Sequence, residues 1–510
     1  MSTVARRFHD TTAHSPYSVR TSGHTLDWDN KPFPFKVYTD TPSIALPRDV
    51  DVIGTPTLAA LATAAPPASR LTLSALTALL YYTAGVTKKK TYPGGGEVLF
   101  RAAASTGALY QTEVYVIAGE VDGLEAGLYH FCPGDFTLRR LRTGDVRQPL
   151  AAAAADPSIG RRAASLVLTG IYWRNTWKYQ ARGFRHLYWD SGTMLANALA
   201  VGGALGLAPA LVTGFVDDDV NRLLGVDPEL EAALELLVVG PAGAAAPPAG
   251  APPPLSLDVM PLSGESVDYP ALREMQQASH LASPAAVEAW RRASVPTQRE
   301  PSGAPVPLPP PARGGRALAE TIQGRGSTRT FGHAALSAQA LADELWAATL
   351  PVPADVPSGL VDLYVIVNAV DDVAPGAYAY RPGHGLTLIR AGEFRREAAY
   401  LTLEQALGGD AAATFFFLAP LDALLAAWGE RGYRLANLEA GIAGGRAYLV
   451  AYASGFGATG LTFYDADVVR FFSPHAAGRD AIFVTALGRP GSTQRGVLLS
   501  NAIQPPTRRS

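Results

Sequence analysis

The chain has 510 residues, too many for one hydrophobic core, so its length predicts two or three domains. Its 43 Lys and Arg residues nearly balance its 45 Asp and Glu residues, and no basic stripe follows a predicted helix, which excludes the charge pattern of a nucleic-acid-binding protein. With one cysteine, Cys132, no zinc-type Cys/His spacing, no secretory signal and no apolar run of about 18 residues, the sequence predicts a cytoplasmic protein without disulfides, metal or membrane contact.

The first half of the chain contains a basic run at Lys88, Lys89 and Lys90. Pro93 and three glycines follow it, a composition typical of loops. We therefore interpret the run as a solvent-exposed loop, and binding of an acidic partner is the less favoured alternative.

Two pairs of segments repeat each other at a single offset. The strand-like segment that begins at Val114 matches the one that begins at Leu363, and a longer segment from Ala181 matches one from Glu430 without gaps. Both pairs are 249 residues apart, since 363 minus 114 and 430 minus 181 give the same number. Two gap-free blocks at one offset indicate a duplicated domain.

Each copy has the same predicted order: a helix, two β-segments joined by a Gly-containing turn, a long helix, a short helix and a final strand. In the first copy, apolar spacing predicts the long helix from about Arg185 to Leu205, and Gly206 ends it. Apolar runs from Ala232 and Ala481 predict final strands that could lie in the middle of a sheet. This order predicts an α+β fold of packed layers.

The segment between the copies is rich in proline and alanine. Such stretches cannot pair in a sheet and favour extended spacers, and a ligand for SH3-type domains is the less favoured alternative. The middle of the segment, roughly residues 269–294, contains helix formers and Trp290, so we expect this part to dock.

In the second copy, residues 455–460 fit the pattern G-x-G-x-x-G. A dinucleotide-binding fingerprint follows a strand and opens a helix. These residues instead follow a long predicted helix, so the context excludes a Rossmann site.

Arg325, Ser327 and Arg329 place two guanidinium groups and a hydroxyl within five residues. Together they could bracket a phosphate through charge-assisted hydrogen bonds. Taken alone, the pattern is more typical of an exposed basic helix start with Ser327 as the N-cap.

Ala104, Ser105, Thr106 and Gly107 form a run of small residues close to Tyr110. Small residues let backbone N–H groups approach a flat ring closely. A plain turn would use the same residues, so the run alone leaves both interpretations open.

Lys178 and Tyr179 follow Trp173 and Trp177. A lysine half-buried among aromatic rings would have its pKa lowered toward neutrality and could act as a base, with Tyr179 sharing or relaying the proton. The alternative, a surface lysine before a packing tyrosine, is the commoner case for such a dipeptide.

Several separated segments, taken together, resemble the SagB/ThcOx group of the nitroreductase superfamily. They are FHDTTAHS and TLDWDNKPFPFKVY near the N-terminus, LLYYTAGVT from Leu79, RAAASTGALY from Arg101, the Lys-Tyr pair at 178–179 and the Arg-x-Ser-x-Arg element at 325–329. The order and spacing of the segments are more specific than any one of them. That group consists of FMN-dependent azoline dehydrogenases, which oxidise thiazolines and oxazolines in ribosomally made peptides.

The resemblance implies a role for each candidate residue. It implies that Arg325, Ser327 and Arg329 bind the FMN phosphate and that the 104–107 loop approaches the flavin. It implies that Lys178 and Tyr179 take the ring proton while a hydride leaves to the flavin. It also implies a backbone lining for the isoalloxazine ring, made by Ala458, Thr459, Gly460, Leu461 and Thr462. The family usually has proline where this chain has Ala104, so the loop is expected to be less rigid here.

The candidate residues divide between the copies. Aligning Leu73 with Leu336 sets the three phosphate ligands opposite Ala62, Ala64 and Pro66. At the 249 offset, the 104–107 loop falls opposite 353–356 and the Lys-Tyr pair opposite Ala427 and Trp428. Because nitroreductases are typically dimers with flavin sites at their interface, the resemblance implies an intrachain pseudo-dimer with one FMN site and an empty mirror-related site.

We therefore predict an N-terminal segment (1–45), a nitroreductase-like domain (46–240), a linker (241–316), a second such domain (317–500) and a tail (501–510). The predicted function is FMN-dependent oxidation of peptide-borne azolines to azoles. The expected partners are a modified precursor peptide as substrate and a cyclodehydratase. Two alternatives stay open: an NAD(P)H-dependent nitro- or quinone reductase of the same fold, and a flavin-free scaffold that binds the precursor peptide for a cyclodehydratase.

Overall fold

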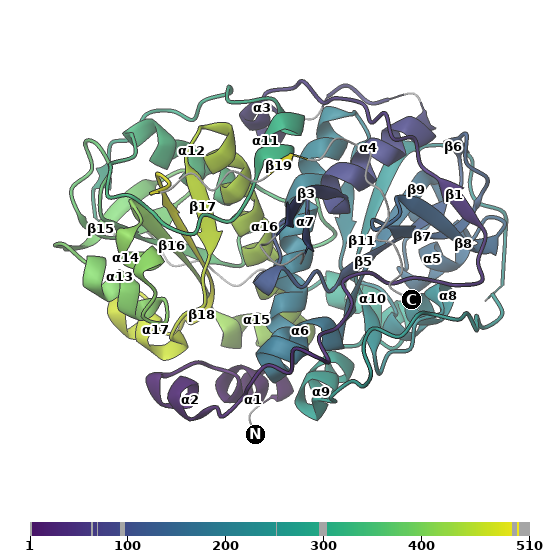
Figure 1. Cartoon of the computed structure of the whole chain (residues 1–510), viewed down its shortest axis with the longest axis horizontal. Helices are drawn as coiled ribbons and strands as arrows, with labels where there is room; N and C mark the ends of the chain where they lie inside the picture. Colours follow the sequence, from purple (N-terminus) through teal and green to yellow (C-terminus); the bar gives the residue numbers. More distant parts are fainter. Residues whose placement is uncertain are drawn as a thin grey trace.

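The computed structural model of the chain describes residues 3–62, 65–68, 70–91, 97–250, 252–294 and 303–491, and the backbone of 497–498. It contains two seven-stranded sheets with two long helices, α7 and α16, between them (Figure 1). The predicted α+β fold with two tandem units is confirmed.

Both large sheets are antiparallel throughout and have the same topology. The first has the order β1-β8-β7-β5-β9-β11-β10 and the second the order β12-β15-β14-β13-β16-β18-β17. The strands of the first sheet are β1 (Ser43–Ala45), β5 (Thr112–Ala118), β7 (Gly127–Cys132), β8 (Thr137–Thr143), β9 (Arg162–Ile171), β10 (Ala210–Val212) and β11 (Glu231–Ala242). The strands of the second sheet are β12 (Pro305–Val306), β13 (Asp362–Val367), β14 (Gly376–Arg381), β15 (Gly385–Ala391), β16 (Ala413–Ala419), β17 (Gly457–Gly460) and β18 (Asp480–Gly488).

The helices also fall into two matching sets. The first unit has α3 (Thr57–Ala62), α4 (Leu73–Ala84), α5 (Arg147–Ala153), α6 (Tyr172–Tyr179), α7 (Gly183–Ala204) and α8 (Asp217–Leu224). The second unit has α11 (Leu318–Gly324), α12 (Ala338–Ala348), α13 (Arg395–Leu401), α14 (Ala406–Asp410), α15 (Leu421–Trp428), α16 (Arg431–Ala453) and α17 (Asp465–Phe472). The N-terminal segment has α1 (Val4–Thr11) and α2 (Pro16–Thr21), and the segment between the units has α9 (Pro270–Ala278) and α10 (Pro284–Arg291), where Trp290 is buried.

The elements agree with the predicted order. The long helix expected in the first copy is α7, and the two expected final strands are β11 and β18, each with a neighbour on both sides. The sequence pattern does not single out the central strands β9 and β16. Both are apolar runs without alternation, because both faces of each strand are buried.

The helices α7 and α16 cross at two glycines. A Cβ on Gly192 would lie 2.7 Å from the carbonyl carbon of Gly441, and a Cβ on Gly441 would lie 2.7 Å from the carbonyl oxygen of Trp189. No larger residue fits such an approach of two backbones. Gly192 and Gly441 are repeat partners at the 249 offset, so the pseudo-twofold axis passes through this crossing.

Buried ion pairs join the two units on both sides of the crossing. In each case one carboxylate at the start of a short helix, α8 or α17, binds two arginines of the other unit. The pairs, with nitrogen–oxygen distances of 2.6–3.1 Å, are Arg182–Asp465, Arg185–Asp465, Arg431–Asp217 and Arg434–Asp217. The arginines correspond at the 249 offset, so the intrachain contacts repeat the symmetry of the duplication.

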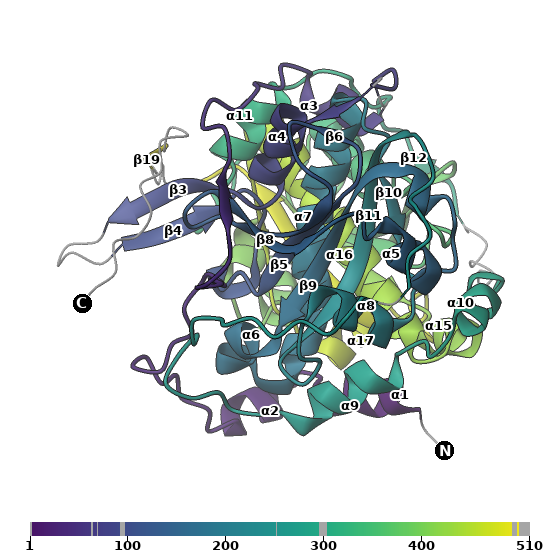
Figure 2. The ribbon, with the colours of Figure 1, turned by 90° about the vertical axis from the view of Figure 1, so that its right-hand side faces the viewer.

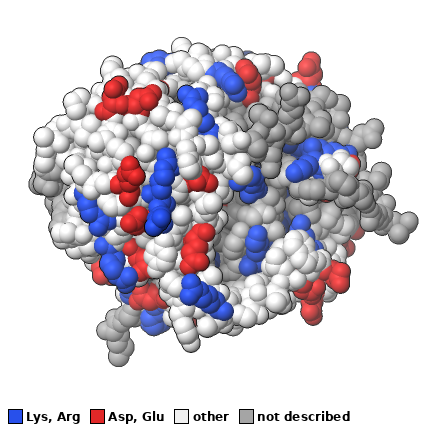
Figure 3. Space-filling model, turned by 60° about the vertical axis from the view of Figure 1, so that its left-hand side comes forward, with Lys and Arg blue, Asp and Glu red and all other residues white. Residues whose placement is uncertain are grey.

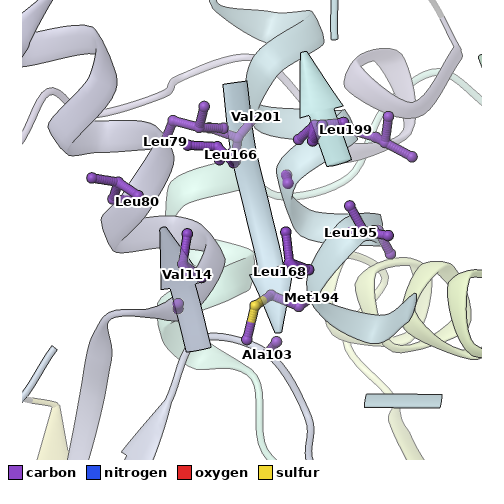
Figure 4. Packing of buried hydrophobic residues seen from close by; sticks show 14 of the residues in the cluster. Leu79, Leu80, Ala103, Val114, Leu166, Leu168, Met194, Leu195, Leu199 and Val201 are labelled. Carbon is purple, nitrogen blue, oxygen red and sulfur yellow. The ribbon is translucent and has the colours of Figure 1, made fainter. Parts of the chain in front are cut away.

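The core of the first unit lies between its sheet and the helices α4 and α7. Figure 4 shows Leu166 and Leu168 of β9 in one cluster with Met194 and Leu195 of α7 and Leu79 of α4. All five side chains are buried. Apolar residues from sheet and helices thus form one continuous support under the middle of α7.

The basic run is a strand, so the expectation of a loop there is wrong. Lys88, Lys89 and Lys90 lie in β3 (Val86–Thr91), which pairs with β4 (Glu97–Arg101) in a ribbon that projects from the body (Figure 2). The strand β19 (Val497–Leu498) pairs with the other edge of β3, and pairing on both edges overrides the local composition. Pro93 and the glycines after it lie outside the described residues.

The small strands β2 (Leu71–Thr72) and β6 (Val121–Asp122) form a separate parallel pair. Among the described helices, none is long and apolar enough to cross a membrane. On the face in Figure 3, Lys and Arg side chains are interspersed with Asp and Glu, and neither sign forms a broad patch there.

Candidate active site at the unit interface

Lys178 and Tyr179 form the last turn of α6, which ends where Gln180 adopts a positive φ of 50°. Both side chains are half-buried. Nζ of Lys178 lies 5.3 Å from the centroid of the Tyr179 ring. Within the described ranges neither the amine nor the hydroxyl has a hydrogen-bond partner, so both polar groups are available to a ligand.

The 104–107 loop lies directly against Tyr179. A Cβ on Gly107 would lie 3.0 Å from Oη of Tyr179, and Gly107 has a φ of +62°. The positive φ and the close approach both favour glycine. The fold therefore brings together two candidate motifs that are far apart in the sequence.

Asp190, a buried carboxylate on α7, fixes this loop. Ser105 Oγ donates to it at 2.6 Å, Gln111 Nε2 at 2.7 Å, and the backbone N–H and hydroxyl of Thr106 at 2.9 and 3.1 Å. Burial raises the pKa of Asp190 to about 6, although these hydrogen bonds favour the ionised form. Since Ser105 and Thr106 use their side chains to position the loop, the loop presents mainly backbone to a ligand.

Asn175 and His186 extend the Asp190 network to Tyr179. Asn175 Nδ2 donates to Thr106 Oγ1 at 2.9 Å, and its Oδ1 lies 2.9 Å from His186 Nδ1. The His186 ring makes a T-shaped contact with the Tyr179 ring, with centroids 4.4 Å apart. Burial keeps the pKa of His186 well below its usual range, so the ring is neutral and acts as packing and support.

Arg329 reaches this cluster from the second unit. Burial, followed by the charges of Arg329 and Lys31, lowers the pKa of Lys178. Burial also raises the pKa of Tyr179, although Arg329 opposes that shift. Arg329 is exposed and makes no hydrogen bond or ion pair with another described residue. Unpaired polar groups from both units therefore meet at one place.

Ser327 lies in an irregular segment between α11 and α12, so it is not the N-cap of a helix. Its Oγ is 3.1 Å from Oη of Tyr448, and that oxygen accepts the backbone N–H of Gly460 at 2.8 Å. Tyr448 therefore ties the Arg-x-Ser-x-Arg element to the 458–462 backbone.

Arg325 points into the first unit. Its Nε and Nη2 donate to the carbonyl oxygens of Ala102 and Arg101 at 2.8 and 2.9 Å. Its guanidinium also lies 5.6 Å from the centroid of the Tyr448 ring. Two of its donors thus anchor the chain just before the 104–107 loop, which leaves Nη1 for a further acceptor.

The residues expected to line a flavin lie at the edge of the second sheet. Ala458, Thr459 and Gly460 belong to β17, and Leu461 and Thr462 follow it. The G-x-G-x-x-G stretch therefore ends α16 and forms an edge strand, which agrees with the exclusion of a Rossmann site. Across the described ranges no hydrogen bond joins 458–462 to the 104–107 loop, so the two stretches stay separate.

The mirror site is closed by the chain itself. At the 249 offset, residues 209–213 correspond to 458–462, and 353–355 correspond to 104–106. Here the two stretches pair directly: Leu211 N–H donates to the Pro353 carbonyl at 2.7 Å, and Asp355 N–H donates to the Leu211 carbonyl at 3.1 Å. The Asp355 carboxylate also accepts the N–H groups of Thr213 and Gly214 at 2.8 and 2.9 Å. Ala64, one of the residues expected here, lies outside the described residues.

The family follows from a match to the model described as "Nitroreductase family", which covers residues 56–240 and 322–477, or 341 of the 510 residues. The chain belongs to the nitroreductase family. Each matched range covers most of one of the two units.

Three relatives of the family have curated names. A candidate nitroreductase of Methanocaldococcus jannaschii is 30% identical over 159 residues, which cover 31% of this chain and 76% of the relative. The trifolitoxin-processing protein TfxB of Rhizobium leguminosarum bv. trifolii is 30% identical over 183 residues, 34% of this chain and 48% of the relative. The microcin B17-processing protein McbC of Escherichia coli is 27% identical over 133 residues, 25% of this chain and 49% of the relative. The chain thus spans about half the length of the two processing proteins.

A crystal structure of a candidate nitroreductase from Anabaena variabilis resembles nearly the whole chain. The likeness covers 96% of this chain and 100% of that one, with 26% identity and a TM-score of 0.77. The arrangement of two nitroreductase units in one chain therefore also occurs in a solved protein of the family.

The groups at the candidate site fit the FMN that nitroreductases generally bind. The Arg329 guanidinium, Nη1 of Arg325 and the Ser327 hydroxyl are donors suited to a phosphate. Among the described residues, the buried Oγ1 of Thr328 also lacks a hydrogen-bond partner. The phosphate donors come from the second unit and the Lys-Tyr pair with its loop from the first, so FMN would contact both units.

Two cavities do not include the candidate groups. One of about 350 Å³ is lined by Glu439 and Arg446 in the second unit, and one of about 680 Å³ is lined by the start of α6 together with residues of 225–231 and 257–269. Neither lining contains Lys178 or Arg329. The candidate site is thus defined by its unpaired groups at the unit interface.

Sequence reasoning missed the residues that support the site. Tyr448, Asn175 and His186 have no motif that announces them. Asp190 could have been found from the repeat. Its partner at the 249 offset is Glu439, so both long helices carry an acid at the same position among mostly apolar residues. An acid kept in register on both long helices predicts a shared structural task.

Proposed function

We propose that this chain is an FMN-dependent dehydrogenase of the SagB/ThcOx type, which oxidises peptide-borne thiazolines or oxazolines to azoles. The observation that carries the proposal is the meeting of Lys178 and Tyr179 with Arg329 of the other unit beside the 104–107 loop. A reductase that receives a hydride from a nicotinamide needs no half-buried, unpaired amine at this place. The azoline dehydrogenation does need a base.

The chain's own groups would manage the proton. Aromatisation removes one proton from the ring carbon next to the carbonyl and one hydride from the neighbouring ring carbon. In its neutral form Lys178 would take the proton and become an ammonium ion, and the lowered pKa of Lys178 increases that neutral fraction. When bound, FMN would accept the hydride and so take up both electrons.

Tyr179 would act as a hydrogen-bond donor and not as the base. Its pKa is raised by burial, so its hydroxyl keeps the proton at neutral pH. From its place between Lys178 and the loop, the hydroxyl could orient the substrate or relay the proton. Ser327, Arg329 and Nη1 of Arg325 would hold the FMN phosphate, and the 104–107 and 458–462 backbones would flank its ring.

The relatives support a peptide as the substrate. Two of them are named for processing the peptides trifolitoxin and microcin B17. We extend that role to this chain as part of the proposal. Its reaction would follow that of a cyclodehydratase, since an azoline must be formed before it can be oxidised, and such an enzyme is the partner class we propose.

An anaerobic single-turnover experiment tests the proposal. FMN-loaded protein mixed with a peptide that carries one thiazoline should lose its yellow absorbance and release a peptide lighter by two hydrogen atoms. The same protein mixed with NADPH serves as the comparison. Bleaching by NADPH without bleaching by the peptide would favour a reductase, and a protein that stays colourless after reconstitution but binds the peptide would favour a scaffold.

A further inference from the structure

Trp28 stands beside the proposed base with most of its ring in solvent. Its side chain is 65% exposed, one of the largest values among the bulky apolar residues of the described chain. It makes a T-shaped contact with Trp177, one residue before Lys178, with ring centroids 5.3 Å apart and planes at 75°. The ring is therefore held on one side and open on the other.

The segment that carries Trp28 is fastened to the candidate site. Trp177 Nε1 donates to the carbonyl oxygen of Asp27 at 2.8 Å, and Nε2 of His24 lies 3.2 Å from the Trp177 carbonyl oxygen. Leu26 packs on the cluster of Leu109, Trp173 and Trp177, where Tyr179 also packs. The position of Trp28 is thus fixed relative to both the Lys-Tyr pair and the loop.

One positive charge lies beside the exposed ring. Nζ of Lys31 lies 5.7 Å from the centroid of the Trp28 ring. Lys31 and Arg329 are also the two charges that act on Lys178 from outside its own helix. Asp27 and Asp29 flank Trp28 in the sequence and are also exposed, and Oδ1 of Asp27 accepts the N–H groups of Asp29 and Asn30 at 3.2 and 3.3 Å.

We propose that Trp28 and Lys31 form a substrate-binding wall, in which Trp28 stacks on the planar heterocycle of the peptide and Lys31 selects an acidic residue next to that heterocycle. This inference rests on the proposed function and names its substrate class: an acidic peptide that carries the azoline. Aromatic faces attract flat rings, and a cation at the rim of a site attracts the opposite charge. At the 249 offset the counterpart of Trp177 on the mirror side is Ala426, so the ring that holds Trp28 is not repeated there.

The test measures binding without turnover, using the full chain loaded with FMN. The probes are two dye-labelled peptides of equal length, each with one thiazole, flanked by glutamates in one and by lysines in the other. Fluorescence anisotropy gives their dissociation constants. We expect the acidic peptide to bind about three- to fivefold more tightly, a preference that weakens with added salt.

Three variants separate the two roles. Lys31→Glu should reverse the preference between the peptides. Trp28→Ala should weaken the binding of both peptides about two- to tenfold, and Trp28→Phe should restore most of it. Arg70→Glu and Tyr400→Ala are matched controls. They change an exposed charge paired with Asp122 of β6 and an exposed ring on α13, both away from α6 in Figure 1, and should change neither constant.

Equal affinities for the two peptides in wild type and in Lys31→Glu, or full binding by Trp28→Ala, would overturn the wall. FMN content and melting temperature are measured on every variant. If Trp28→Ala loses FMN or stability, the charge reversal at the exposed Lys31 still decides the inference. Turnover of a thiazoline peptide by the wild type is a separate measurement. Its absence would contradict the proposed function, whereas turnover without any preference between the two peptides would contradict only the substrate-binding wall.

Discussion

The candidate site and the mirror site are built from corresponding segments, but the segments are placed differently. At the candidate site the loop that contains residues 104–106 is held by Asp190 and makes no hydrogen bond to 458–462 within the described ranges. At the mirror site residues 353–355 pair directly with β10. The comparison shows how a duplicated fold can keep one site. Polar groups stay unpaired at the candidate site, while at the mirror site the backbone N–H and carbonyl groups of the two stretches hydrogen-bond to each other.

The acids on the two long helices show what decides between these outcomes. Asp190 receives the loop at Thr106, whereas its repeat partner Glu439 receives the N–H groups of Gly359, Leu360 and Val361 at 2.8–3.2 Å. In the second unit Glu439 of α16 therefore binds the chain just before β13, and residues 353–355 pair with β10. The stretch that the acid binds thus differs between the open candidate site and the closed mirror site.

The largest expected effect comes from the proposed base. Lys178→Ala should lower the rate of thiazoline oxidation by about 10²- to 10⁴-fold, because a positioned base is lost, and should still bind FMN, because the phosphate ligands lie on the other unit. Single-turnover bleaching measures the rate and released flavin measures the binding. Ala427→Lys, which places a lysine at the mirror position, is the control. Added to Lys178→Ala, it should not restore the oxidation rate. Unchanged bleaching in Lys178→Ala would remove the proposed role.

Arg329 should matter next most, through the cofactor. Arg329→Ala should weaken FMN binding about 10- to 100-fold, because a charge-assisted hydrogen bond is lost. Arg325 is left unchanged in this variant since it anchors the chain at Arg101 and Ala102. Flavin titration gives the dissociation constant, with the exposed Arg316→Ala as control. Full affinity in Arg329→Ala would refute the assignment.

Asp190 and Asp355 offer a matched pair, because each accepts hydrogen bonds from four donors. Asp190→Ala and Asp355→Ala should each lower the free energy of unfolding by about 1–3 kcal/mol. Only Asp190→Ala should also lower FMN content, because only it loosens the 104–107 loop. Thermal melts and flavin content measure both effects, and equal flavin loss in the two variants would contradict the asymmetry.

The smallest effect concerns pH. Lys178 must be neutral to accept a proton, so the rate of the oxidation half-reaction should rise with pH through the lowered pKa of Lys178. Lys31→Ala removes one of the charges that lower this pKa, so its profile should move to higher pH. An ordinary lysine titrates near 10.4, and a profile with that midpoint in the wild type would show that burial does not tune the amine.

Much of the fold could be predicted from the sequence, because the repeat and the apolar runs are local signals. The long helix α7 and the final strands β11 and β18 follow from spacing alone. The basic run at Lys88 to Lys90 could not, since its strand depends on pairing with β4 and β19, and β19 lies far along the chain.

The candidate site likewise has residues that the sequence could name and contacts that it could not. Lys178, Arg329 and Ser327 could be named as candidates through the resemblance to the SagB/ThcOx group, since their patterns taken alone favour ordinary surface roles. Two details depend on tertiary contacts and could not be predicted. Arg325 donates to backbone carbonyls of the other unit, and Tyr448 bridges Ser327 and Gly460. The closure of the mirror site has no sequence signal at all, since it consists of backbone hydrogen bonds between residues 353–355 and β10.

The ratio of bound FMN to chain distinguishes one open site from two. Protein reconstituted with excess FMN and then desalted is denatured, and the released flavin is compared with the protein concentration. The account predicts a ratio that approaches one, because the loop stays open at the candidate site and the mirror site is filled by 353–355. A ratio that approaches two would contradict the closure of the mirror site, and a ratio near zero would contradict the cofactor assignment itself.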